Sequence, residues 1–138
     1  MASFGFHAFL QTALKGDLDF DVVTFKCALT SSAYTPDKDH DFFNDVTNEV
    51  SPSGTYAAGG PTVTVTVTRD TANDRIDISL GSLSVTGATI TARYGVYYVE
   101  RAGASSTDDL VAVIDFGSDV ISTASTWALT ASTLRFQF

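Results

Sequence analysis

The chain has 138 residues, of which 44% are apolar and only 17% are charged, and its formal net charge is −8. This length predicts a single domain with a hydrophobic core of its own. The acidic balance argues against nucleic acid and anionic membrane surfaces as partners, because both bind clustered Lys and Arg side chains. No apolar run approaches the ~20 residues of a membrane-spanning helix, and a single cysteine excludes an intrachain disulfide.

The first residues predict one short amphipathic helix over about residues 4–15. Its apolar side chains recur at helical spacing: Phe6, Phe9, Leu10, Ala13 and Leu14. Ser3 is the predicted N-cap, and Gly16 fits the position just past the last turn. Because no basic stretch and no long apolar segment stand here, we expect no secretory signal peptide and synthesis in a cytoplasm.

From residue 18 the apolar period changes to two, which predicts a strand that begins at about Leu18. Three aspartates would share its solvent-facing side: Asp17, Asp19 and Asp21. The phase shifts at residues 22–23, where we expect a bulge. Farther along, Cys27 is predicted to be a buried, inert thiol. Residues 31–46 then predict a long polar loop with one helical turn at 41–45.

The clearest strand lies at residues 62–68, where valines alternate with threonines. Residues 71–75 predict a turn, and the alternating Ile76, Ile78 and Leu80 predict its hairpin partner. Further strands are expected near residues 83–85, 90–98, 110–116, 127 and 134–138.

One of these strands is predicted to place five alternating side chains on a single face: Ile90, Ala92, Tyr94, Val96 and Tyr98. In all, the chain predicts about seven to nine short strands. This number favours an all-β fold, mainly an antiparallel sandwich or a jelly-roll-like barrel, with a short N-terminal amphipathic helix. We expect one domain over residues 1–138.

An acidic loop supplies the best candidate metal ligands, Asp37, Asp39 and Asp41. Alternate aspartates in a loop bind Ca²⁺ in EF-hands, but the position that needs Gly is Phe42 and the position that needs Glu is Asn48. We therefore expect a solvated loop and no metal.

No other residue pattern points to catalysis. His7 and His40 stand at no recognised metal spacing, and His7 is expected to pack partly buried beside the helix. The chain has no nucleophile elbow and no phosphate-binding glycine pattern, so we expect neither an enzyme nor a cofactor. Four aromatic residues form either a binding platform or core: Tyr94, Tyr97, Tyr98 and Trp127.

Five short motifs follow one another along most of the chain. They are L-x-S-S-x-Y-x-P-D at residues 29–37, N-E-V at 48–50, G-x-Y-x-x-G-G at 54–60, I-T-A-R-x-x-V-x-Y at 90–98 and I-D-F-G-S-D at 114–119. In this order they resemble a widespread family of small virion structural proteins of tailed bacteriophages. The chain departs from that family at residues 118–133, which are rich in Ser, Thr and Ala.

The resemblance implies a head or tail component of the virion, assembled in the host cytoplasm. We expect a capsid decoration or cement protein that stabilises the head by bridging capsid subunits. Its partners would be the major capsid protein or other virion proteins, and copies of itself in a homo-oligomer, with a trimer favoured. A tail or baseplate protein is the alternative. A receptor-binding module using loops 34–43 and 103–109 fits less well, because most aromatic residues lie in predicted strands or the helix.

Contacts between subunits are expected at both ends of the chain: Phe4, Phe6, Leu134, Phe136 and Phe138. The alternative is that these side chains complete the core of their own domain.

Overall fold

The computed structural model describes residues 3–138. Its elements in chain order are β1 Phe4–Gly5, α1 His7–Leu14, β2 Thr24–Thr30, η1 Phe43–Asp45, β3 Thr62–Val63, β4 Val65–Asp70, β5 Arg75–Leu80, β6 Leu83–Glu100, η2 Ser105–Thr107, β7 Leu110–Leu129 and β8 Ser132–Gln137. The predicted all-β fold with a short helix near its start is confirmed, and η1 is the helical turn expected at 41–45. Within residues 3–138 no helix is long and apolar enough to cross a membrane.

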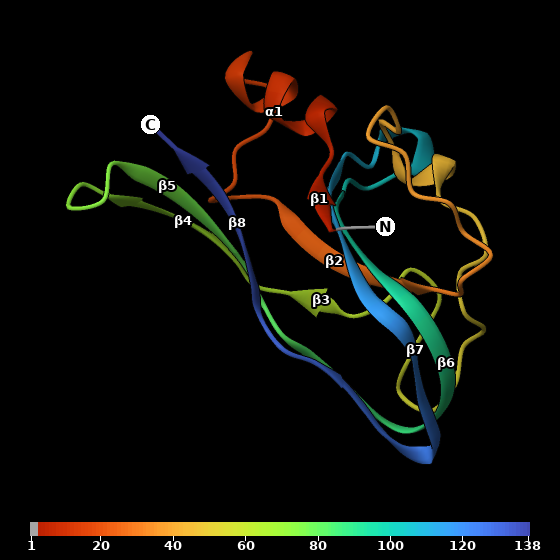
Figure 1. Cartoon of the computed structure of the whole chain (residues 1–138). Helices are drawn as coiled ribbons and strands as arrows, with labels where there is room; N and C mark the ends of the chain where they lie inside the picture. Colours follow the sequence, from red (N-terminus) through yellow and green to blue (C-terminus); the bar gives the residue numbers. More distant parts are fainter. Residues whose placement is uncertain (1–2) are drawn as a thin grey trace.

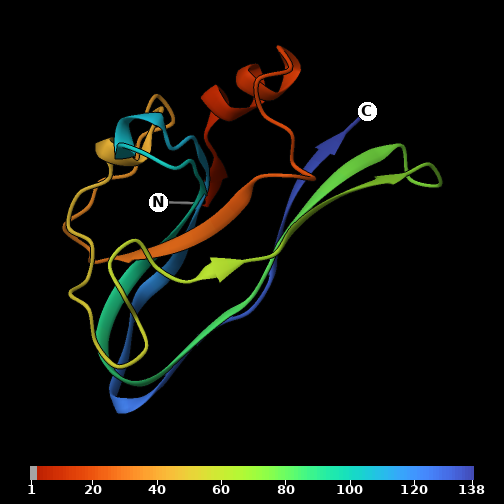
Figure 2. The same cartoon turned by 180° about the vertical axis from the view of Figure 1, so that it is seen from behind.

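The strands form two antiparallel sheets that share one core. The larger sheet has the order β1-β7-β6-β2-β3, and the smaller has the order β4-β5-β8. The long strands β6 and β7 run to the lower end of the molecule, where the chain turns into β5 and β8 of the smaller sheet (Figures 1 and 2). From this end the two sheets spread apart, and α1 lies between their far ends.

The helix begins later than its periodicity predicts. Phe4 and Gly5 pair with β7, so they form a strand that extends the larger sheet, and α1 starts only at His7. Ser3 is not the N-cap, since its hydroxyl accepts a hydrogen bond from the backbone N–H of Asp115 (2.8 Å). Gly16 does follow the helix, with a φ of 85° that suits glycine.

The prediction that a strand begins at Leu18 is wrong. Residues 18–19 have no regular structure, residues 20–23 form a turn and a bend, and β2 starts at Thr24. The side chain of Asp19 accepts the N–H of Asp21 (3.0 Å), a local hydrogen bond that competes with a strand ladder. Leu18 is nevertheless buried and Phe20 packs against the core, so alternating burial arises here from turns, and the aspartates share no strand face.

The valine and threonine run is divided between the two sheets. Val63 ends β3 in the larger sheet and Val65 begins β4 in the smaller one, so the prediction of a single strand is wrong. At the crossing the carbonyl of Thr64 accepts the N–H of Gly81 (2.8 Å). The hairpin of β4 with β5 is confirmed, and Val67 pairs with Ile78.

The single face predicted for β6 is also wrong. Ile90 and Ala92 join the large core between the sheets, whereas Tyr94 joins a smaller cluster with Val96 and Tyr98. The change coincides with a break in register, where Ala92 pairs with Val120 and Tyr94 with Asp115. Because β7 has extra residues at this point, the sheet bends there. Residues of β6 before and after the bend therefore pack in different clusters.

Candidate docking surface

The three aspartates proposed as metal ligands are engaged in separate local contacts. A carboxylate oxygen of Asp37 accepts the N–H of Asp39 (3.0 Å), and Asp39 itself lies 2.8 Å from Nε2 of His7. The N–H of Asp41 donates to Asp45 (2.9 Å). Among residues 3–138 no three His, Cys, Asp or Glu side chains come together in a way that could hold a metal ion. His7 is exposed, so its expected partial burial is wrong.

Neither the thiol nor the second histidine is placed for nucleophilic chemistry. Cys27 is fully buried, as predicted, and this burial raises the pKa of its thiol, so the thiol stays protonated. Nδ1 of His40 lies 3.0 Å from the hydroxyl of Tyr34, and the two rings stack. Both groups therefore serve packing.

The four aromatic residues considered as a binding platform all lie inside the protein, each at most 7% exposed: Tyr94, Tyr97, Tyr98 and Trp127. The polar atoms of Tyr97, Tyr98 and Trp127 have partners in the protein. The hydroxyl of Tyr98 donates to the carbonyl of Gly59 (2.7 Å), and the indole N–H of Trp127 donates to the carbonyl of Val120 (3.1 Å). The core alternative holds for this set.

Two of the motifs that carry the family resemblance meet at one carboxylate. Oε1 of Glu49 accepts the hydroxyl of Tyr56 (2.8 Å) and the backbone N–H of Gly59 (2.6 Å). The same hydroxyl accepts the N–H of Leu29 in β2 (2.9 Å). Glu49 and Tyr56 thus tie a long loop to the middle of the larger sheet.

Two further motifs meet in an ion pair. Arg93 on β6 donates from Nε to Asp115 on β7 (2.7 Å), and Asp115 also accepts the N–H of Gly117 (2.8 Å). The hydrogen bonds from Arg93 and Gly117 hold the pKa of Asp115 down at about 2. This pair lies where the register of β6 and β7 breaks. The motif residues therefore brace the fold, and sequence reasoning could not see which of them would pair.

The residues expected at subunit contacts differ widely in exposure. Phe6 is 1% exposed in the smaller cluster, which favours the alternative that it completes its own core. Phe4 is half-buried, with its ring edge against Phe6 (5.4 Å between centroids). Leu134 and Phe136 are half-buried against the large core, whereas Phe138 is 83% exposed.

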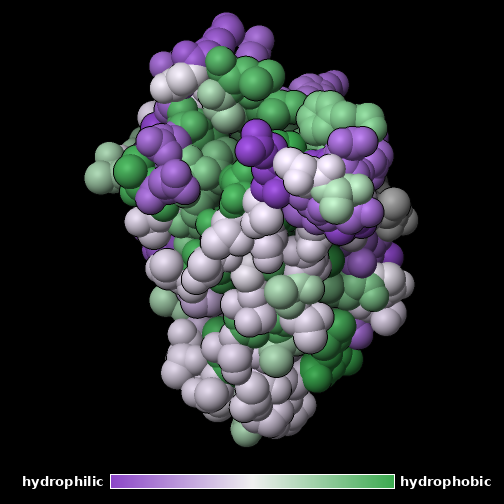
Figure 3. Space-filling view, turned by 90° about the vertical axis from the view of Figure 1, so that its left-hand side faces the viewer, coloured by the Kyte–Doolittle hydropathy of each residue, from purple (hydrophilic) through white to green (hydrophobic). Residues whose placement is uncertain are grey.

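An apolar trough lies between α1 and the smaller sheet. We use this name for a hollow of about 630 Å³ whose apolar walls come from both sides: Phe9, Leu10, Ala13, Leu14, Phe20, Val67, Ile76, Ile78, Phe136 and Phe138. Leu14 and Phe138 remain largely in solvent, and Val67 is about half exposed. In the view toward the β4–β5 end of the molecule, apolar and strongly hydrophilic side chains lie next to one another in the upper part, while most of the lower part is pale (Figure 3).

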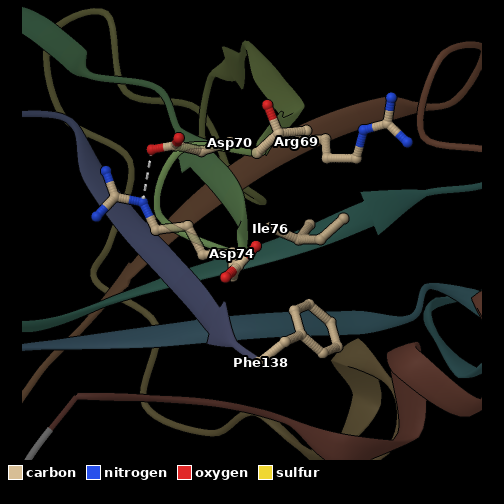
Figure 4. Close-up of a pocket in the computed structure, with 7 residues that line it drawn as sticks. Arg69, Asp70, Asp74, Ile76 and Phe138 are labelled. Atoms are coloured by element: carbon tan, nitrogen blue, oxygen red, sulfur yellow. Dashed lines mark ion pairs between the residues drawn. The ribbon is translucent and has the colours of Figure 1, made fainter.

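The trough continues to the tip of the smaller sheet. A second hollow of about 460 Å³ there shares Ile76 and Phe138 with it. Around these two side chains stand Arg69, Asp70 and Asp74, and Asp70 is held in an ion pair (Figure 4). The surface is thus apolar along its floor and charged at its rim, which is the pattern of a protein-docking surface.

No protein-family model, no curated protein and no solved structure matches the chain. The fold is an all-β domain with an apolar trough between α1 and the smaller sheet, and its paired motif residues connect separate segments of the fold.

Proposed function

We propose that this protein is a structural component of a tailed-phage virion that decorates the capsid and stabilises the head by bridging capsid subunits. The order of five motifs along the chain supports the family, and the contacts of their residues support a structural role. Glu49 and Tyr56 anchor a loop to the sheet, and Arg93 and Asp115 lock the longest hairpin. Such internal ties make a rigid body.

The observation that carries the proposal is the apolar trough on this rigid frame. A protein that acts alone rarely leaves a continuous apolar surface in water, so the trough indicates a partner protein. A decoration protein acts by binding only the assembled shell, which shifts the assembly equilibrium toward the intact head. Many modest contacts repeated over a lattice add up through avidity, so each one need not be large.

Purified virions test the proposal. The amount of this protein relative to the major capsid protein is measured by quantitative mass spectrometry of intact particles. Decoration predicts a copy number of the same order as that of the capsid protein. Only a few copies per particle would point to the tail or baseplate, and absence from particles would refute a virion role.

A second measurement addresses stabilisation directly. Heads assembled without this protein should disassemble at a lower temperature than complete heads, and adding the purified protein back should restore the difference. Heads that melt at the same temperature with and without bound protein would refute the cement function.

A further inference from the structure

We infer that the free edge of β8 pairs with β8 of a second copy of this chain about a two-fold axis, which joins two smaller sheets into one and covers part of the apolar trough. β8 pairs with β5 along one side through a regular antiparallel register from Ser132 to Gln137. On its other side no strand of the described chain pairs with it. Such an edge is a template for another strand.

The direction of the backbone groups follows from one hydrogen bond. The N–H of Phe138 donates to the carbonyl of Asp74 (2.9 Å), on the β5 side of the strand. Because alternate residues of a strand direct their backbone groups to the same side, those of Thr133, Arg135 and Gln137 face the open edge. The side chains of these three residues are exposed to solvent.

β8 lacks two of the devices that usually protect an edge. It has no proline, and its register with β5 has no bulge. Its one charged side chain, Arg135, is held over its own sheet by two hydrogen bonds to Asp77 (2.7 and 3.1 Å). The guanidinium of Arg135 therefore points toward β5 and does not place its charge over the open edge of β8.

Side-chain pairing selects the position of the two-fold axis. An axis at Arg135 would set two arginines directly opposite each other, which is destabilising. An axis at Leu134 would leave Phe138 beyond the ladder. An axis at Phe136 places Arg135 opposite Gln137 of the second copy, and Leu134 opposite Phe138, which is 83% exposed in the single chain. The last register covers the most apolar surface and opposes no like charges.

The charge of this face allows a second copy to be its occupant. The chain has a net charge of −8, which opposes association of two copies through an acidic face. The smaller sheet and its turns, residues 65–80 and 132–138, carry no net charge, because three arginines balance three aspartates: Arg69, Arg75 and Arg135 against Asp70, Asp74 and Asp77. Two copies can approach through this face without net repulsion, and a strongly charged partner would gain nothing there.

A ring of three copies through the same sheet is less favourable. It would pair β8 of one copy with β4 of the next, and both strands run antiparallel to β5. The new pairing would be parallel about an axis along the strands, and parallel ladders are slightly less stable per residue. The self-complementary edge therefore favours the two-fold dimer over the trimer expected from the resemblance.

Sedimentation equilibrium of the full chain tests this inference, which goes beyond the virion role and can fail independently of it. The unmodified protein should be a dimer. Phe138→Asp places like charges in the joined trough, and Gln137→Pro removes an outward N–H that would donate to Arg135 of the second copy, so each should weaken dimerisation at least about tenfold. Ile121→Asp is the matched control, because Ile121 is 67% exposed on β7 and receives the same charge. It should leave the dimer unchanged.

Near-UV circular dichroism identifies any variant that fails to fold. If Gln137→Pro fails to fold, the comparison of Phe138→Asp with the control tests the dimer. A monomer or trimer as the main species overturns the inference, as does equal weakening by Ile121→Asp.

Phe136→Cys tests the register, since residues opposite each other at a non-hydrogen-bonded position lie about 4.5 Å apart. Mild oxidation should yield a covalent dimer, because Cys27 is fully buried and cannot compete. Absence of this crosslink refutes the axis at Phe136.

Discussion

Replacing Gly60 with alanine should strongly destabilise the fold. Gly60 has a φ of 79°, a backbone conformation that side chains disfavour. An added Cβ would overlap the carbonyl oxygen of Cys27 and lie 2.6 Å from its carbonyl carbon. These are backbone atoms of β2, held in place because the N–H of Cys27 donates to the carbonyl of Pro61 (3.1 Å). The alanine cannot be accommodated unless β2 moves.

The expected loss in the free energy of unfolding of Gly60→Ala has two contributions. A residue other than glycine at positive φ costs about 1–2 kcal/mol, and overpacking a core position costs about 1–3 kcal/mol more. The total of about 2–5 kcal/mol is a large part of the roughly 5–15 kcal/mol that stabilises a typical domain. Gly16 is the matched control, because its φ is 85° and no atom lies within 4 Å of an added Cβ. Gly16→Ala should show the first effect alone.

Urea unfolding, followed by the fluorescence of the buried Trp127, measures the free energy of unfolding for both variants. We expect Gly60→Ala to lose about 1–3 kcal/mol more than Gly16→Ala. Equal losses for the two variants would refute the close approach of Gly60 to the backbone of β2 in solution.

Three other substitutions follow from the same structure. Val65→Asp should abolish soluble folding, because it buries an unpaired charge in the core between the sheets; the soluble fraction and far-UV circular dichroism measure this. Tyr56→Phe should lower the free energy of unfolding by about 1–3 kcal/mol in urea titrations, because it leaves the N–H of Leu29 without its acceptor. Asp115→Asn should lower stability at neutral pH. Since Arg93 holds the pKa of Asp115 at about 2, below its ordinary value, that contribution is present above about pH 4 and is lost as the pH falls toward 2.

For each of these three predictions, a specific result would contradict the reasoning. Thr66→Asp is the control for the valine, because Thr66 is exposed on the same strand, and equal damage from both substitutions would mean that the charge acts elsewhere than in the core. A Tyr56→Phe protein as stable as the unmodified one would show that water replaces the hydroxyl. If unmodified protein and Asp115→Asn differ equally at pH 7 and pH 2, the ion pair with Arg93 is not the source of the stability.

Much of the class of fold could be predicted from local patterns. Alternation of valine with threonine, and the turn between Asp70 and Arg75, specify the β4–β5 hairpin because they act over neighbouring residues. The same local reasoning failed at Leu18, where turns reproduce the alternating burial of a strand. It failed again at Thr64, where the chain crosses between sheets without any break in its pattern.

The exposure of the residues expected at subunit contacts could be predicted only in part. Phe138 is exposed and Phe6 is buried, although both belong to the same kind of apolar run. Nothing local distinguishes them, because Phe6 is covered by residues from distant strands and Phe138 lies beyond their reach.

The sequence by itself determined that this protein is built from strands, where its helix lies and which residue types form its core, since these depend on periodicity and on local conformational preference. The tertiary structure alone decided that Glu49 meets Tyr56, that Arg93 meets Asp115 and that β8 keeps an open edge beside an apolar trough. The physical reason is sequence distance. Such pairs and surfaces arise only when segments tens of residues apart are brought together, and no local pattern records which segments will meet.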